Sequence, residues 1–170
     1  MKTLNNIEDN KEFISIVKDI LDNNKFMKLK ECIHHGTSRY EHSLRVSYYS
    51  YKVTKTLKLN YIETARGGLL HDFFFSCEER TTKDRFISTF THPEKALDTA
   101  KSHFELSDKE KNMIRSHMFP INFSVPKYAE SWIVSIVDKF VATSELSLKY
   151  KFKFRYAYNV ILLFVLGFIK

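Results

Sequence analysis

The feature that most restricts the fold of this chain is the adjacent pair His71-Asp72, which closes the apolar run Gly67-Gly68-Leu69-Leu70 inside a predicted helix. Burial of an imidazole and a carboxylate costs several kcal/mol unless each side chain finds a polar or charged partner. A divalent cation would satisfy both side chains together. The pair therefore indicates a helical interior with a metal site, and it predicts further ligands elsewhere in the chain.

Further candidate ligands lie on both sides of this pair. His42 precedes it, His92 and His117 follow it, and Asp138 comes directly after the mostly apolar run 132–137. Taken alone, each has a simpler explanation, because histidines are common at helix ends and a carboxylate can pair with a basic neighbour. Together they form an ordered series of imidazoles and carboxylates, which are side chains that bind divalent metals in enzymes.

This ordered series resembles the HD superfamily of metal-dependent phosphohydrolases, all-helical enzymes named after the His-Asp dipeptide. The segment 39–46 is similar to the family's first-histidine helix, with an arginine three residues after His42, and Asp138-Lys139 is similar to its last ligand. His92, before Pro93-Glu94, and His117 resemble the extra histidines of members that bind two metals. The resemblance covers about residues 34–145 and implies an all-α fold, a single HD-domain helical bundle.

The resemblance also implies how the metal ligands are divided between two ions. Asp72 would bridge the ions, with His42, His71 and Asp138 on one ion and His92 and His117 on the other. Iron or manganese is the metal expected from the same resemblance. A mixed set of histidines and carboxylates would also accept zinc, nickel or cobalt.

The expected reaction is hydrolysis of a phosphoester or phosphoanhydride by metal-bound hydroxide, with Asp72 and Arg45 as catalytic residues. Arg45 lies one helical turn after His42 and could bind a phosphate, with a surface ion pair as the alternative. Lys139 is expected to be a solvated lysine, with a phosphate contact as its alternative. By analogy with dinuclear bacterial relatives, the expected substrate is a nucleotide or dinucleoside polyphosphate. Two other functions stay open: an HD-type sensor that binds a nucleotide without turnover, and a di-iron oxygenase.

Composition fits one domain over residues 1–170, with a core at about 34–148, an N-terminal packing helix and an apolar C-terminal segment. A chain of 170 residues that is 44% hydrophobic can bury a substantial core, and 4 Gly and 3 Pro leave no obvious linker. The net charge of +7 would suit phosphate esters, nucleic acid or acidic lipid alike. We expect a small-molecule phosphate ester or nucleotide as the partner rather than nucleic acid. Cys32 and Cys77 have no zinc or disulfide pattern, and the polar N-terminus predicts a cytoplasmic protein.

Helix starts are predicted by four capping boxes, in which a cap residue is followed three residues later by glutamate. The boxes are Ser38 with Glu41, Asn60 with Glu63, Thr91 with Glu94, and Ser107 with Glu110. They predict helices over about 38–57, 61–74, from 92 onward, and 108–118, and a further helix is expected over 127–148. Near the N-terminus, apolar residues at helical spacing predict a packing helix: Phe13, Ile14, Val17, Ile20 and Leu21.

Two segments carry weaker patterns. Residues 76–90 are expected to be a polar loop beside the His-Asp pair, facing the substrate. Residues 149–158 alternate basic and aromatic side chains as an exposed strand would, and the apolar run 160–169 is too short to span a membrane. We favour a packing helix or a homo-oligomer contact for this run, with membrane association of the C-terminal segment as the alternative.

Overall fold

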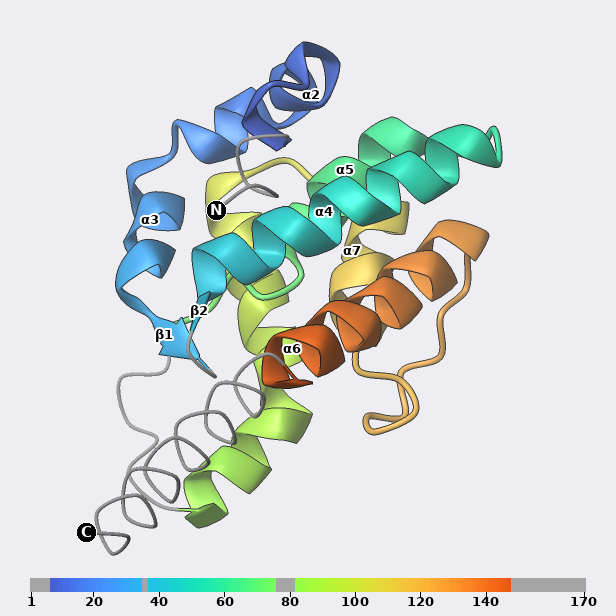
Figure 1. The fold of residues 1–170 in the computed structure, drawn as a ribbon. Helices are drawn as coiled ribbons and strands as arrows, with labels where there is room; N and C mark the ends of the chain where they lie inside the picture. The colour runs from blue at the N-terminus through green and yellow to red at the C-terminus, as the bar shows by residue number, and fades with distance from the viewer. Residues whose placement is uncertain (1–6, 35–36, 76–81, 148–170) are drawn as a thin grey trace, which may run out of the picture.

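The computed structural model describes residues 7–34, 37–75 and 82–147, with side chains for all of these except residues 34, 82–87 and 89 (Figure 1). The elements in chain order are α2 (Lys11–Leu21), α3 (Asn24–Met27), the 3-10 helix η1 (Lys28–Glu31), β1 (Ile33–His34), β2 (Thr37–Ser38), α4 (Arg39–Thr56), α5 (Tyr61–Leu70), α6 (Thr82–His103), α7 (Asp108–Ser116) and a helix over residues 129–147. The two strands form a short antiparallel pair. The predicted all-α fold class is confirmed.

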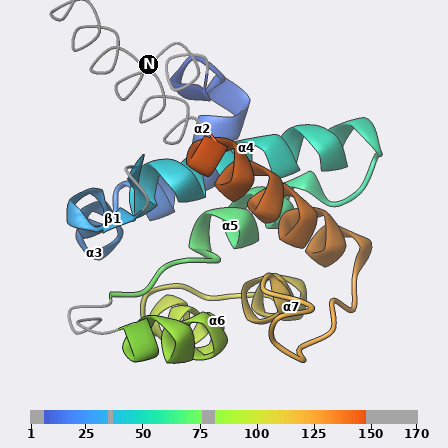
Figure 2. The same ribbon diagram turned by 60° about the horizontal axis from the view of Figure 1, so that its bottom comes forward.

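Helices α4 and α5 form a hairpin at the centre of the molecule. Helix α5 contacts α2 and α7 in addition to α4, and α6 packs against α7. Figure 2 shows α6 and α7 together on one side of α5, with the helix 129–147, in orange, crossing α4. This helix is anchored by a small apolar cluster in which its Val134 and Val141 join Val46 of α4 and Met113 of α7. The predicted burial of Val134 and Val141 on one face is therefore confirmed.

The larger core joins α2, α3 and η1 to the central hairpin and extends to α6 and α7. The predicted N-terminal packing helix is α2, whose buried residues are Phe13, Val17 and Ile20. Phe13 contacts Tyr48 and Tyr51 of α4, with ring centroids 5.2 and 5.4 Å apart. Aromatic contacts of this kind add to the free energy gained from burial alone. Helix α2 thus holds the outer side of the hairpin whose inner side faces the predicted ligands.

Three of the four predicted helix starts are confirmed by their caps. The side chains of Ser38 and Asn60 each accept a hydrogen bond from the backbone N–H three residues later. Ser107 and Glu110 form a complete capping box, in which each side chain binds the other residue's backbone N–H. These bonds satisfy N–H groups that lack a partner within the helix, and so they fix where α4, α5 and α7 begin.

The fourth predicted start is wrong, because residues 91–94 lie inside α6 rather than at its beginning. The helix starts at Thr82 and passes through Pro93. Proline removes one backbone donor from a helix, which weakens and bends it without always ending it. The carboxylate of Glu94 pairs with Arg115 of α7, 2.7 Å away, instead of capping a helix start. The loop predicted over 76–90 is likewise wrong for residues 82–90, while residues 76–81 lie outside the described residues.

The second predicted helix is too long at its C-terminal end. Helix α5 ends at Leu70, so His71 and Asp72 lie in a turn rather than in the helix predicted to reach residue 74. The ring of His71 donates its Nδ1–H to the carbonyl oxygen of Gly68, 2.8 Å away. That oxygen is one of the last carbonyls of the helix, which have no partner within it. His71 therefore caps the helix that it follows.

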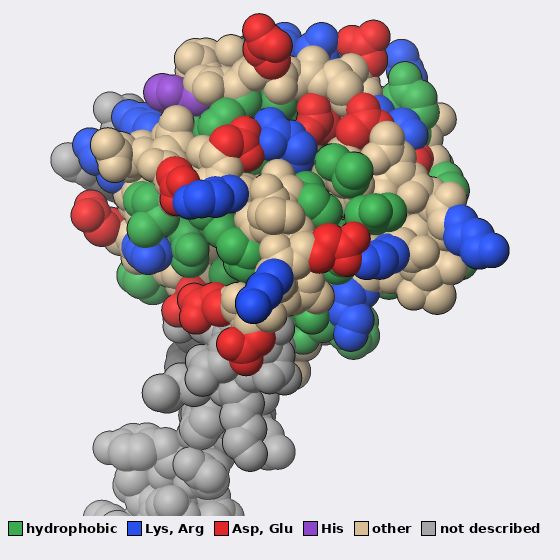
Figure 3. Space-filling view, turned by 90° about the horizontal axis from the view of Figure 1, so that it is seen from above, with side chains coloured by type: hydrophobic (Ala, Val, Ile, Leu, Met, Phe, Trp, Pro, Cys, Tyr) green, Lys and Arg blue, Asp and Glu red, His purple; other side chains and the backbone are tan. Residues whose placement is uncertain are grey.

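Several remaining expectations concern the surface and the chain ends. No helix within the described residues is long and apolar enough to cross a membrane. Cys32 is a free thiol, whereas Cys77 and the segment 149–169 lie outside the described residues. Figure 3 shows basic and acidic side chains interspersed on the face seen from above. On that face, the net positive charge is not gathered into one basic patch.

Candidate metal centre

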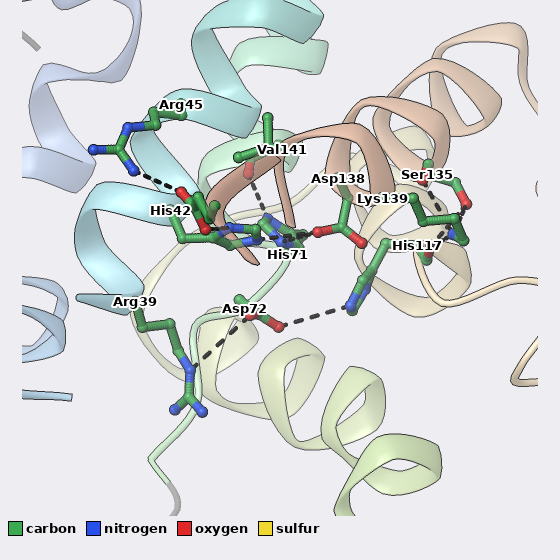
Figure 4. A network of polar contacts seen from close by, with 12 residues as sticks. Arg39, His42, Arg45, His71, Asp72, His117, Ser135, Asp138, Lys139 and Val141 are labelled. Carbon is green, nitrogen blue, oxygen red and sulfur yellow. Dashed lines mark hydrogen bonds and ion pairs between the residues drawn. The ribbon is translucent and has the colours of Figure 1, made fainter. Parts of the chain in front are cut away.

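The six predicted metal ligands come from five separate elements and meet in one place. His42 lies in α4, His71 caps α5, Asp72 follows it in the turn, His92 lies in the middle of α6, His117 caps α7, and Asp138 lies in the helix 129–147. Figure 4 shows five of them, His42, His71, Asp72, His117 and Asp138, pointing toward one another. The structure thus brings the whole set together, and the role of each residue as a ligand stays a prediction.

The closest approach in the cluster is between two histidines. The Nε2 atoms of His92 and His117 lie 2.9 Å apart. The Nδ1 of His92 lies 2.9 Å from the carbonyl oxygen of Ser88, and that of His117 lies 2.8 Å from the carbonyl oxygen of Ile114. A carbonyl only accepts, so both Nδ1 atoms carry the proton. In the neutral rings, the two Nε2 lone pairs therefore face one another, an arrangement that a shared cation would stabilise.

Burial keeps one of these rings neutral. Burial, together with the neighbouring rings of His71 and His92, lowers the pKa of His117 to about 3. At neutral pH its Nε2 is therefore available as a ligand. Metal binding requires the neutral imidazole, because the proton and the metal compete for the same nitrogen.

Two polar atoms at the centre are buried and make no hydrogen bond, namely Nε2 of His71 and Oδ1 of Asp72. Unsatisfied buried polar atoms are rare, and each needs an explanation. The Nε2 of His71 lies 3.5 Å from Oδ1 of Asp138, and Oδ1 of Asp72 lies 3.5 Å from Nε2 of His92. A divalent metal between these atoms would satisfy them. The residues present therefore fit a metal centre.

The ligand atoms fall into two overlapping groups, each compact enough to hold an ion. One group is His42, His71 and Asp138, and the other is His71, Asp72 and His117. Within each group the ligand atoms lie within 4.8 Å of one another. The first group contains the residues assigned to one ion by the sequence, and the second lies on the side of His92 and His117.

Asp72 lies between the guanidinium group of Arg39 and the imidazole rings of His92 and His117. Its Oδ2 lies 4.0 Å from Nε of Arg39, while its Oδ1 faces His92 and His117. Burial favours the protonated carboxyl, but the neighbouring imidazoles, led by His71, hold the pKa of Asp72 below its usual range. The guanidinium of Arg39 also lies 3.9 Å from the ring centroid of Phe74, which stacks on His92. Arg39 was not predicted as a site residue.

His42 has a carboxylate at each ring nitrogen. Its Nε2 lies 3.0 Å from Oδ1 of Asp138, and its Nδ1 lies 3.0 Å from Oε2 of Glu145. Burial alone would lower the pKa of His42, but the hydrogen bonds to Asp138 and Glu145 raise it to about 10. A carboxylate behind a histidine fixes the orientation of the ring and increases its basicity as a ligand. Glu145 was missed by the sequence analysis, although it lies seven residues after Asp138, on the same face of the helix.

Arg45 and Lys139 bind protein groups in this structure. Arg45 donates from Nη1 to Oε1 of Glu145 over 2.6 Å, so it supports the carboxylate that holds His42. Its predicted contact with a substrate phosphate stays untested. Lys139 is partly buried and donates to the carbonyl oxygen of His117 over 2.8 Å, so the expectation of a solvated lysine is wrong. Burial lowers the pKa of this ammonium group.

Comparisons with known proteins agree with this geometry. The family model of the HD domain matches residues 39–143, which span all six predicted ligands. No curated protein and no solved structure matches the chain. The matched region covers more than half of the sequence, and it begins with the helix of His42 and ends in the helix of Asp138. The chain therefore belongs to the HD domain family, in which metal-dependent phosphohydrolases are common.

Proposed function

We propose that the chain is a metal-dependent phosphohydrolase that uses two divalent ions, iron or manganese, to cleave a phosphoester or phosphoanhydride. A nucleotide or dinucleoside polyphosphate is the substrate class we favour, by analogy with dinuclear members of the superfamily. The observation that carries the proposal is the convergence of His92 and His117, whose Nε2 atoms lie 2.9 Å apart with both Nδ1 protons committed to carbonyl oxygens. Two histidines thus point to the same centre in addition to the His-Asp pair, His42 and Asp138.

The family resemblance implies how the ions would be held. His42, His71 and Asp138 would hold one ion, His92 and His117 the other, and Asp72 would bridge them. Bound divalent ions lower the pKa of coordinated water and neutralise charge on phosphoryl oxygens. Asp72 suits the bridging position because its pKa is held below the usual range, which keeps the carboxylate ionised at neutral pH.

The surrounding residues would orient the ligands. Glu145 holds the ring of His42, and Arg45 holds Glu145. Arg39 places its Nε 4.0 Å from Oδ2 of Asp72. It would limit the rotation of the bridging carboxylate and add positive charge where a phosphate would bind.

Metal analysis and a substrate screen together test the proposal. The purified chain should contain about two transition-metal ions, and the metal-free chain should regain phosphate release from nucleotides or dinucleoside polyphosphates when manganese or iron is added. Asp72→Ala should lose metal and at least about a hundredfold in turnover, while its helical circular dichroism persists. Asp22→Asn is a matched control, because this carboxylate is exposed and pairs only with Lys18 among the contacts described.

Other results would point to the alternative functions. Nucleotide binding with no phosphate release under any metal would indicate a sensor rather than an enzyme. Iron-dependent oxygen consumption, with no hydrolysis under manganese, would indicate an oxygenase. Full metal content and turnover in Asp72→Ala would contradict the assignment of the centre itself.

A further inference from the structure

The backbone carbonyl of His117 accepts hydrogen bonds from two side chains of the helix 129–147, Ser135 and Lys139, which together are called the clamp. Its oxygen accepts a hydrogen bond from Oγ of Ser135 over 2.7 Å and one from Nζ of Lys139 over 2.8 Å. The same Lys139 donates to the carbonyl oxygen of Ser135 over 3.1 Å and to its Oγ over 2.8 Å. Figure 4 shows Ser135 and Lys139 beside His117 and next to Asp138.

These bonds use every side-chain donor of Ser135 and Lys139. An ammonium group has three donors, and Lys139 directs one to the His117 carbonyl and two to Ser135. A carbonyl oxygen has two lone pairs, and that of His117 receives both Ser135 and Lys139. Ser135 is almost fully buried, and Lys139 is partly buried. Lys139 is therefore committed to the protein and not to a phosphate.

The carbonyl bound by the clamp belongs to His117 itself, so its position limits where the His117 ring can lie. His117 caps the C-terminal end of α7, where carbonyl groups have no partner within the helix. The ring is tied to the same turn through its bond to the Ile114 carbonyl. With ring and backbone both fixed, the Nε2 atom of His117 has little freedom to move away from His92 and Asp72.

The clamp also links the two halves of the centre. Lys139 directly follows Asp138, which lies 3.0 Å from the Nε2 of His42. The helix 129–147 thus supplies a ligand to one ion position and, through the neighbouring side chain, holds the backbone of a ligand of the other. The distance between the two positions is set by this helix and the end of α7.

We propose that Lys139 and Ser135 are positioning residues for the metal position that contains His117, and that their clamp is required for tight binding of the second ion. This proposal rests on the two-metal function proposed above. It assigns to Lys139 a role in metal occupancy rather than in substrate binding. Loss of the clamp would let the end of α7 move. It would weaken the binding of one ion and leave the binding of the other unchanged.

The test measures manganese binding to the metal-free chain by equilibrium dialysis and elemental analysis. Lys139→Met keeps most of the apolar stem but has no donor, and we expect one ion to bind about tenfold to a hundredfold more weakly, as is typical for loss of an outer hydrogen bond. The affinity for the other ion should change by less than about twofold. Ser135→Ala, which retains Lys139, should cause a smaller change in the same direction. It replaces Lys139→Met as the test variant if Lys139→Met does not fold.

A double-mutant cycle separates positioning from general stability. In a His117→Ala background, where the second position is already lost, Lys139→Met should have no further effect on the remaining ion. Thr143→Ala is the matched control, since it removes an exposed hydrogen bond to the Lys139 carbonyl on the same helix and does not touch His117.

Each outcome decides between the two proposals. A wild-type chain that binds two ions, with Lys139→Met and Ser135→Ala unchanged in both affinities, overturns the positioning role alone. The positioning role is also overturned if Lys139→Met lowers the affinity for both ions equally. The same holds if it still lowers the affinity for the remaining ion in the His117→Ala background. A wild-type chain that binds only one ion overturns the two-metal function and the positioning role with it.

Discussion

Metal binding to this chain should release a proton from His42, and the affinity should therefore rise with pH. Although burial opposes it, hydrogen bonding to Asp138 and Glu145 raises the pKa of His42 to about 10. At pH 7 only about one ring in a thousand is then neutral, which costs roughly 4 kcal/mol of metal-binding free energy. His117, whose pKa burial lowers to about 3, has no such proton to lose.

The affinity for the ion at His42 should rise about tenfold per pH unit from pH 7 toward pH 10. Calorimetric titration of manganese into the metal-free chain, in buffers of different ionisation enthalpy, counts the protons released. A coordinated water can release a proton as well. Glu145→Gln separates the two sources, because it removes one of the two carboxylates that raise the pKa of His42. At pH 9 this variant should release fewer protons than the wild type. Glu94→Gln, an exposed control on α6, should release as many protons as the wild type.

Stability of the metal-free chain gives an independent check. Folding raises the pKa of His42 from its ordinary value of 6.5 to about 10, so its stabilising contribution is complete below about pH 6.5 and is lost as the pH approaches 10. The urea midpoint of the metal-free chain should fall across this range, and bound metal should reduce the fall. A metal affinity that stays constant between pH 7 and 9, with no proton released, would refute the assignment of a protonated His42.

Three further predictions concern single positions. His92→Ala should cut the bound metal from about two ions towards one per chain, measured by elemental analysis, and an unchanged content would make His92 structural. Gly67→Ala and Gly68→Ala should each lower the urea midpoint by the equivalent of about 1 to 3 kcal/mol, because an added Cβ would lie 2.7 Å from Sδ of the buried Met113 at Gly67 and 3.1 Å from the backbone Cα of Ser47 at Gly68. An unchanged midpoint would contradict the tight packing of α5 against α7 and α4. Lys58→Gly should raise the urea midpoint by the equivalent of about 1 kcal/mol, since Lys58 has a φ of 57°, and a decrease would show that its side chain contributes more than the strain costs.

The beginnings of helices could be predicted where a local hydrogen bond decides them. Ser38, Asn60 and Ser107 each cap a helix through a partner three residues away, which the sequence displays directly. The same pattern misled at Thr91, because a threonine and a glutamate three residues apart also occur inside helices. Only the packing of α6 against α7, where Glu94 meets Arg115, distinguishes the two cases.

The ligand cluster could be named from the sequence because metal ligands are limited to a few residue types and the order resembles a known family. The residues that support the ligands could not be named, because their partners are distant in the chain. Glu145 lies 103 residues from His42 and 100 residues from Arg45. The clamp on the carbonyl of His117 depends on backbone position, for which the sequence offers no signal.

The ring bonds of the four histidines have a consequence for how the centre forms during folding. His71 and His117 each donate to a carbonyl three residues earlier, and His92 donates to one four residues earlier. The tautomer and direction of these three rings are thus fixed by bonds within a single turn of chain, and the rotamer entropy lost by these ligands is offset by a local partner. His42 alone among the four has its Nδ1 partner on a distant helix, so its orientation requires that the helix 129–147 is docked.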